Sequence, residues 1–308
     1  MSERSGGSVP AAPTLPDMAP MLAETAESAG PGLVRRLVRH RSARLGLGII
    51  AFFVLATLVG PLLLRGNPSN DLNFQDLANA FLRPSPAHPL GTDQLGRDEL
   101  VRLIYGARYT LTIGLAAVAL GLVVGVPLGA ASGYFGGWAD LLAQRLVDIV
   151  LAFPGFLLAL ALVAALGPGL RNVIVSVAVT SFPRFVRLLR ASVLSVRELA
   201  YVEAARSVGV RTGAILFRHV VPNSLAPIIV QATLELGGAI ITAAGLGFLG
   251  IGVQQPTPEW GGMLGSSRDY IFSDSALITY PGICILAVVL AVNLVGDALR
   301  DVLDPRLR

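Results

Sequence analysis

The sequence predicts an all-helical membrane protein with six transmembrane helices. Hydrophobic residues make up 53% of the 308 residues, and charged residues make up only 14%. The mean hydropathy is +0.66, a value that argues against an ordinary soluble globular protein. The apolar residues gather in runs of about 20, the length that an α-helix needs to cross a hydrocarbon core of about 30 Å.

The composition also excludes several kinds of catalytic and binding site. All 24 basic residues are arginine, so no lysine can serve as a Walker A residue, a Schiff base or a general base. We therefore expect that this chain holds no cofactor and that any ATP is bound by another chain. A single cysteine, Cys284, and the widely spaced His40, His88 and His219 predict neither an intrachain disulfide nor a metal site.

The N-terminal part divides into a tail and a first helix. Residues 1–32 are rich in Pro, Ala, Ser and Gly and contain no aromatic residue, which predicts a disordered cytoplasmic tail. Residues 33–64 combine a basic flank with the first apolar run, 45–64. Because this run begins far from the N-terminus, we expect an uncleaved transmembrane helix rather than a signal peptide.

Residues 65–108 predict an extracytoplasmic segment that leads into the second helix, 109–132. The segment ends in the string HPLGTDQLGRDEL. We expect Thr92 or Asp93 to cap a helix there, and the charges around Arg97 and Asp98 to form ordinary surface ion pairs rather than a ligand site.

A glycine turn leads from the second helix into the third, which we expect to end near residue 166. Arg145 and Asp148 stand three residues apart and are expected to neutralise each other. Pro154 should kink this helix. The fourth helix is expected over 173–189, and arginines near its end begin a basic flank: Arg184, Arg187 and Arg190.

The fifth helix, expected over 225–253, carries polar residues within an apolar run. A carboxylate such as Glu235 costs about 2.5 kcal/mol or more at mid-span, so it tends to face a cavity or a partner. Two interpretations stay open: Glu235 contacts a substrate amine, or it is a neutral or paired residue bonded to Gln231 or to a neighbouring helix. A sixth helix over 277–295 precedes the C-terminal segment, 297–308.

Arginine placement predicts the orientation. With six spans and a cytoplasmic N-terminus, seventeen of the 24 arginines fall on the cytoplasmic side, as membrane topology favours. Both termini are then cytoplasmic. The same explanation accounts for the pI near 9.7, so we expect no nucleic-acid partner.

A polar loop, 190–224, interrupts the apolar pattern between the fourth and fifth helices. Ala204 and Ala205 keep one helical face thin, so that a partner surface can approach closely. Gly209 is placed to end that helix in the left-handed conformation. Thr212 is expected to cap a second short helix whose apolar residues are Ile215, Leu216 and Phe217.

This loop resembles the EAA loop of bacterial ABC importer permeases. The matching positions are Glu203, Ala204, Ala205, Gly209 and Pro222. Two positions depart, because His219 and Val221 replace the usual Ile and Leu. Three further stretches, GTDQLGRD, GFLGIGVQQPTPEW and GDALRDVLDP, are similar to the dipeptide, oligopeptide and nickel branch, and specifically to its second (C-type) permease.

The resemblance implies a type I importer permease fold in a bacterial inner membrane, moving peptides without chemical change. It implies a homologous second permease, two subunits that bind ATP and Mg²⁺, and an extracytoplasmic peptide-binding protein, all assembled at the lipid bilayer. The implied ATPase-coupling residues are Glu203, Ala204, Ala205, Arg206, Gly209, Arg211, His219 and Pro222. Gln231 and Glu235 are the candidates for the translocation path.

Other functions stay open at this point. A nickel chelate or another small solute could replace the peptide within the same family. An ion-driven carrier would normally show acidic or histidine relays within its spans. An intramembrane enzyme would need a Ser–Lys pair, an HExxH motif or paired aspartates within the spans, which the sequence does not contain.

Overall fold

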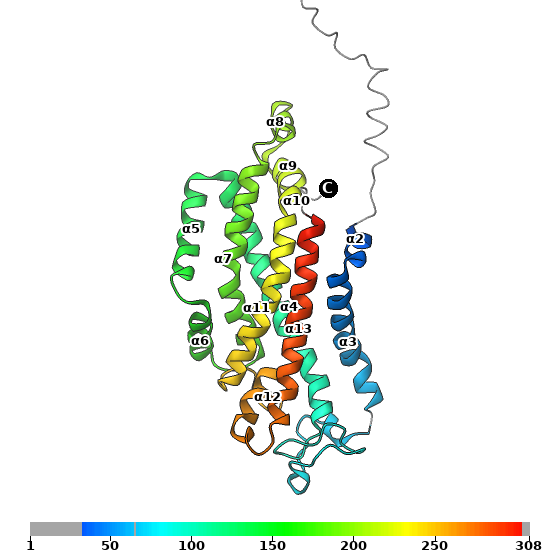
Figure 1. Ribbon diagram of the computed structural model, residues 1–308. Coiled ribbons are helices and arrows are strands. Elements are labelled where there is room, and N and C mark those ends of the chain that lie inside the picture. Colours follow the sequence, from blue (N-terminus) through cyan, green and yellow to red (C-terminus); the bar gives the residue numbers. More distant parts are fainter. Residues whose placement is uncertain (1–32, 65, 304–308) are drawn as a thin grey trace, which may run out of the picture.

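The computed structural model describes residues 33–64 and 66–303. The tail predicted over 1–32 and the end of the C-terminal segment, 304–308, lie outside the described residues. Within the described residues the regular structure is helical, apart from one isolated bridge between Thr92 and Asp98. The long helices run side by side in an elongated bundle (Figure 1), which confirms the all-helical fold class.

Five described helices are long and apolar enough to cross a membrane, and the number is six if one bent pair counts as a single span. The bent pair is α5 and α6, which meet at 87° across a break that contains Pro154. The kink expected at this proline is therefore confirmed, as a complete break. The five long helices are α3 (Arg41–Leu63), α4 (Glu99–Phe135), α7 (Leu170–Val196), α11 (Ala226–Phe248) and α13 (Ala276–Leu303), and the bent pair is α5 (Gly137–Leu151) and α6 (Gly155–Leu166).

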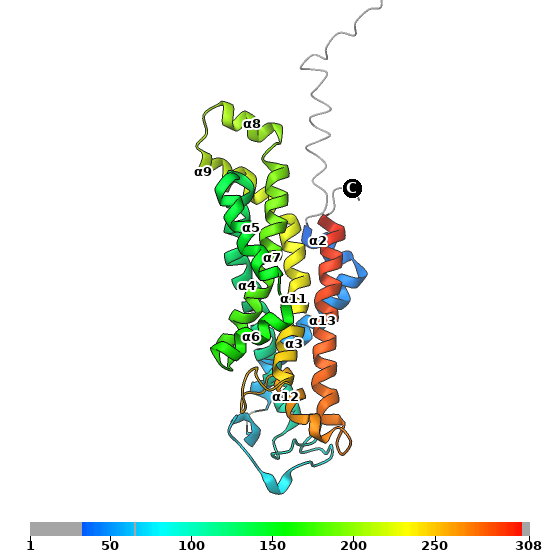
Figure 2. The same ribbon diagram turned by 90° about the vertical axis from the view of Figure 1, so that its left-hand side faces the viewer.

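Short helices lie at the two ends of the bundle. We call the end that carries the 190–224 loop the loop end, and the opposite end the far end. At the loop end lie α2 (Leu33–Arg39), α8 (Ala200–Ser207), α9 (Thr212–Ile215), the π-helical turn η3 (Leu216–Val220) and α10 (Val221–Ser224). At the far end lie η1 (Pro68–Asn70), η2 (Leu77–Asn79), α12 (Trp260–Ser267) and η4 (Arg268–Tyr270). Figures 1 and 2 show that α2 and the end of α13 share the loop end.

Helices α4 and α7 pack closely through small residues, as glycine allows between helices in lipid. A Cβ added at Gly125 would lie 2.7 Å from the Cβ of Phe185. One added at Gly129 would lie 2.7 Å from the carbonyl oxygen of Val186. Not every glycine makes such a contact. A Cβ added at Gly238 on α11, or at Gly250 in the loop after it, would meet nothing within 4 Å, and Gly250 has a φ of +79°.

A second core lies toward the far end, where α12 is held against α3 and α4. The ring of Trp260 is fully buried and meets Phe53 edge-on, with ring centroids 5.3 Å apart. Its Nε1 donates to the carbonyl oxygen of Leu103 at 3.0 Å, which satisfies the only polar atom of the side chain. Helix α12 had no counterpart in the sequence prediction.

The second long helix begins ten residues earlier than the predicted 109. Its cap is Asp98, whose carboxylate accepts from the backbone N–H of Val101, so the assignment of the cap to Thr92 or Asp93 was wrong. Asp93 instead caps the preceding turn by accepting from the N–H groups of Leu95 and Arg97.

The charges before α4 are buried, not on the surface as predicted. Asp93 and Arg97 pair at 2.7 Å with 5% and 3% of their side chains exposed, and Arg102 approaches the same carboxylate at 3.4 Å. A buried ion pair needs further hydrogen bonds to offset desolvation. Arg97 obtains one from Gln255, whose side-chain oxygen accepts from Nη2 at 3.0 Å.

The expected pair within the third span is also wrong. Asp148 accepts from Nη2 of Arg187 on α7 at 2.7 Å, rather than from Arg145 on its own helix. The fifth helix ends at Phe248 instead of 253, because the chain turns at Gly250. The sixth continues to Leu303, eight residues beyond its predicted end.

Candidate functional site: the coupling loop and the translocation face

The coupling loop, residues 190–224, forms the tip of the loop end (Figure 1). Helix α8 ends at Ser207, and Gly209 has a φ of +78°, which confirms the predicted left-handed turn. The N–H of Gly209 donates to the carbonyl of Arg206, and the N–H of Val210 donates to that of Ala205, both at 3.1 Å. These bonds satisfy carbonyl groups that the helix end would otherwise leave open.

The outer surface of this tip is accessible. Glu203, Ala204, Arg206, Arg211 and Pro222 are exposed, whereas Ala205 and His219 are half-buried. Underneath, Val202 and Ile215 are buried and attach the tip to the bundle. Two apolar side chains are strongly exposed: Val208 at 78% and Phe217 at 72%. Phe217 was expected among the apolar residues of the second short helix, but only Ile215 and Leu216 point inward.

The second short helix is built differently from the prediction. Thr212 is its first residue, and the capping position belongs to Arg211, whose side chain makes no capping hydrogen bond. The turn then widens into the π-helical η3 before α10 begins. Pro222 lies in the first turn of α10, directly after the wider turn of η3.

Two arginines fasten the base of the loop to the bundle. Arg190 on α7 forms a two-point pair with Asp140 on α5, at 2.6 and 2.7 Å. Arg197, the residue that follows α7, donates from Nη1 to the carbonyl oxygen of Gly133 near the end of α4, at 2.8 Å. The base of the loop is therefore connected directly to α4 and α5.

The other candidate residues lie inside the bundle. Glu235 on α11 is 7% exposed, and Nη1 of Arg184 on α7 donates to its two carboxylate oxygens at 2.9 and 2.8 Å. Nε2 of Gln231 donates to Glu235 Oε1 at 3.0 Å. Of the two interpretations left open for Glu235, the structure selects the paired carboxylate. Arg184 is thus a mid-helix partner and not part of the basic flank.

Polar residues recur on one face of α7, with Ala191 among them. Thr180, Arg184, Arg187 and Ser195 recur at helical spacing and are all exposed or half-buried. We call this surface, together with Gln231 and Gly238 of α11, the translocation face. Sequence reasoning found Gln231 and Glu235 but missed Arg184, although its position three residues before Arg187 on a long apolar helix was a usable signal.

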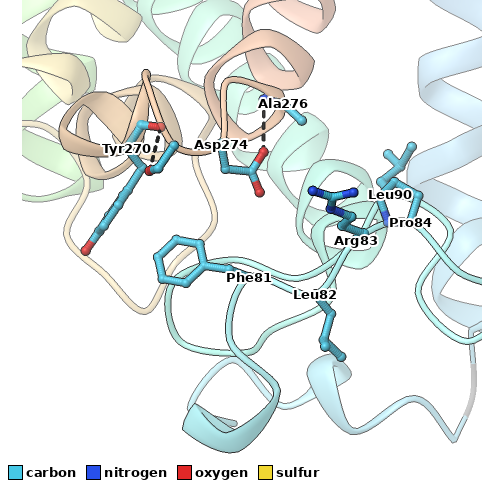
Figure 3. A pocket seen from close by; sticks show the side chains of 9 residues that line it. Phe81, Leu82, Arg83, Pro84, Leu90, Tyr270, Asp274 and Ala276 are labelled. Carbon is cyan, nitrogen blue, oxygen red and sulfur yellow. Dashed lines mark hydrogen bonds between the residues drawn. The ribbon is translucent and has the colours of Figure 1, made fainter.

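The far end carries a pocket of about 520 Å³ between the 66–98 segment and the loop before α13 (Figure 3). Phe81 and Tyr270 meet there with ring centroids 4.9 Å apart. Phe81 has a φ of +58°, a conformation that bulky residues rarely adopt. Phe272, close by in the chain, is completely exposed. Sequence reasoning did not single out these aromatic residues.

Comparison with known families gives two matches. Residues 125–308 match the family described as "Binding-protein-dependent transport system inner membrane component". Residues 32–84 match a second family, described as "N-terminal TM domain of oligopeptide transport permease C". Together the matches include the coupling loop, the translocation face and the first transmembrane helix.

Several curated proteins are similar over most of their length. The dipeptide transport system permease protein of Alkalihalophilus pseudofirmus is 47% identical over 89% of this chain and 89% of its own. The di/tripeptide transport system permease protein of Pseudomonas aeruginosa is 47% identical, covering 87% and 89%. The glutathione transport system permease protein of Pectobacterium atrosepticum is 42% identical, covering 89% and 90%.

Solved structures support the fold independently. Two inward-facing crystal forms of the MetNI methionine ABC transporter contain a chain that this protein matches with TM-scores of 0.53 and 0.52, at 22% and 20% identity. Each match covers 65% of this chain, and 96% and 95% of the other. The extent and identity of the sequence matches show that this chain belongs to the inner-membrane permease components of binding-protein-dependent ABC importers, which are not themselves enzymes.

Proposed function

We propose that this chain is the C-type permease of an ATP-driven importer of di- or oligopeptides. The observation that carries the proposal is the 47% identity, over 89% of the chain, to a permease named for dipeptide transport. The helices would alternate between inward-facing and outward-facing arrangements around the translocation face, in a pair with a homologous second permease. The substrate would cross unchanged.

The coupling loop is the proposed contact with one of two ATP-binding subunits, which hold ATP and Mg²⁺. The exposed Glu203 and Arg206 on α8 offer charged groups, and the exposed Val208 and Phe217 offer apolar ones. A mixed surface of this kind is typical of a protein–protein contact. The arginine connections from the loop base to α4 and α5 give the route by which ATPase movement reaches the spans.

We propose a bacterial cytoplasmic membrane location with the loop end inside. The loop, α2 and the end of α13 share one end of the bundle (Figure 1). These segments carry the positive charge expected on a cytoplasmic side, in Arg35, Arg36, Arg39, Arg190, Arg197, Arg206, Arg211, Arg218 and Arg300. The far end then faces outward, where an extracytoplasmic peptide-binding protein would deliver substrate. Its exposed Phe272 and Leu77 suit such a contact.

The test is purification of the tagged chain from its native membrane, comparing wild type with Glu203→Arg plus Gly209→Pro. ATP-binding subunits should accompany the wild type and be lost from the variant, while the second permease stays with both. Arg268→Gln, at an exposed far-end position, is the matched control and should retain every subunit. Absence of any ATP-binding subunit from the wild type would contradict the proposal.

Transport itself distinguishes the substrates. The glutathione-transport relative makes glutathione a second candidate. Uptake of a labelled dipeptide into vesicles should stop when ATP is depleted and persist when ion gradients are collapsed. Competition by unlabelled dipeptide but not by glutathione supports the first candidate, and the reverse supports the second.

A further inference from the structure

Arg184 lies about midway along α7 and uses only part of its hydrogen-bonding capacity. Its Nη1 donates to both oxygens of Glu235. Within the described part of the chain, Nε and Nη2 have no hydrogen-bond partner, and 54% of the side chain is exposed. These two nitrogens form the planar edge with which arginine holds a carboxylate through two parallel hydrogen bonds.

The cost of exposing a charge to hydrocarbon argues against this edge facing lipid. A charged group exposed to the hydrocarbon core is costly, so such groups face a water-filled path or another protein chain. The α7 face that carries Arg184 also carries the half-buried Thr180 and the exposed Arg187, and Gly238 is exposed on the neighbouring α11. The translocation face is therefore a polar strip within the spans.

The broken span borders the same place. A Cβ added at Gly155, the first residue of α6, would lie 3.9 Å from the Cβ of Thr180, one helical turn from Arg184. A Cβ added at Gly245 on α11 would lie 2.8 Å from the ring of Phe156, the next residue of α6. The break between α5 and α6 thus adjoins both helices that carry the Arg184–Glu235 pair. Discontinuous helices border the substrate path in many transporters.

We propose that Arg184 binds a carboxylate of the substrate during translocation, while Glu235 holds the guanidinium in place and shares its charge. This inference rests on the proposed peptide import and deepens it, because every linear peptide with a free C-terminus carries such a carboxylate. Glu235 also lowers the affinity for the substrate, since one guanidinium then pairs with two carboxylates. A transport site must release its substrate as readily as it binds it.

The test uses the complete importer, with both permeases, the ATP-binding subunits and the binding protein, reconstituted in liposomes. Uptake of trialanine is compared with uptake of its C-terminal amide, each at a concentration that saturates the binding protein. Arg184→Gln should lower the ratio of acid to amide uptake about tenfold or more, because it removes a charge-assisted two-point contact. Arg187→Gln, on the same face but paired with Asp148, is the matched control and should leave this ratio unchanged.

Three results would overturn the inference. Arg184→Gln could reduce uptake of both peptides equally, Arg187→Gln could change the ratio as much, or Arg184→Gln could release the second permease and so identify Arg184 as a subunit contact. Failure of the proposed function itself is distinguishable, because the wild type would then import neither peptide in response to ATP.

A second variant keeps the inference testable if Arg184→Gln does not assemble. Glu235→Gln leaves Arg184 charged but removes its competing anion. It should lower the KM for trialanine about tenfold and slow its turnover, with no change in KM for the amide. Equal changes in KM for the two peptides would contradict a carboxylate contact.

Discussion

The guanidinium of Arg197 reaches across from the end of α7 and donates to the carbonyl oxygen of Gly133 at 2.8 Å, which connects the coupling loop to the last turn of α4. A second, longer bond of 3.4 Å runs from the same nitrogen to the carbonyl of Tyr134. A charged side chain therefore anchors the loop at the point where α7 ends.

Arg197→Gln should loosen this anchor. A hydrogen bond from a charged donor contributes about 1.5 kcal/mol, which corresponds to roughly a tenfold change in a local opening equilibrium. Hydrogen exchange at the amides of α8 should accelerate by about that factor, as measured by mass spectrometry. Arg218→Gln, at an exposed position in the same loop, is the control. Equal exchange in both variants would show that Arg197 does not hold the loop.

Gly209 should be intolerant of side chains. At a φ of +78° a β-branched residue is strained. Gly209→Val should therefore lower the stability of this turn by about 1–2 kcal/mol and displace α8 from α9. The expected result is loss of ATP-binding subunits during purification. Gly213, four residues later, has no positive φ and no neighbour within 4 Å of an added Cβ, so Gly213→Ala should retain them. Retention by Gly209→Val would contradict the proposed docking role of this turn.

The contact between α4 and α7 should be sensitive to a single methyl group. Gly125→Ala places a Cβ 2.7 Å from that of Phe185, and overpacking of this kind costs about 1–3 kcal/mol. The midpoint of thermal unfolding in detergent should fall. Gly48→Ala on α3 meets nothing within 4 Å and should leave the midpoint unchanged or raise it.

The buried charges around the start of α4 should stabilise the fold only as a group. Asp93→Asn leaves Arg97 and Arg102 buried without their shared carboxylate, which should lower the free energy of unfolding by about 3–5 kcal/mol. Asp269→Asn removes an exposed pair with Arg268 and should change stability by less than about 0.5 kcal/mol. Thermal unfolding of the two variants measures the difference, and similar midpoints would contradict the buried network.

Glu259 should make stability depend on pH. Burial raises the pKa of this carboxyl, although N–H groups of Gly261 and Gly262 and the hydroxyl of Thr110 donate to it and oppose the shift. The protonated, neutral form of Glu259 therefore stabilises the fold. This stabilisation is fully present below the ordinary pKa of 4.5 and is lost as the pH rises through the raised pKa.

As the pH rises from 5, the midpoint of thermal unfolding should therefore fall further in the wild type than in Glu259→Gln, because the glutamine does not titrate. The difference between the two pH profiles isolates the carboxyl from other titrating groups. Parallel profiles would show that burial does not control its protonation.

Local patterns were sufficient for much of the fold. Apolar runs located the spans, Pro154 marked the break in the third, and Gly209 marked the end of α8 because only a left-handed residue closes that turn. Helix ends were less predictable. Several residues before α4 could have served as its cap. Asp98 accepts from the N–H of Val101, whereas Asp93 accepts from the preceding turn and pairs with the buried Arg97 and Arg102.

Charge pairing was the least predictable part of the site. Arg145 and Asp148 have the right spacing on one helix, yet Asp148 turns to Arg187 on the neighbouring α7. Arg184 and Glu235 lie 51 residues apart in the chain. Spacing identifies only partners on the same helix, whereas these pairs are set by how α5, α7 and α11 pack.

The length of α4 gives its end connections a mechanical consequence. Its 37 residues extend for about 55 Å, from the buried charges at the far end to the anchor of the coupling loop. A row of glycines lets α7 pack closely against it. A tilt of a few degrees imposed on so long a pair at the loop end would displace the opposite end by several ångströms, without any helix having to unwind.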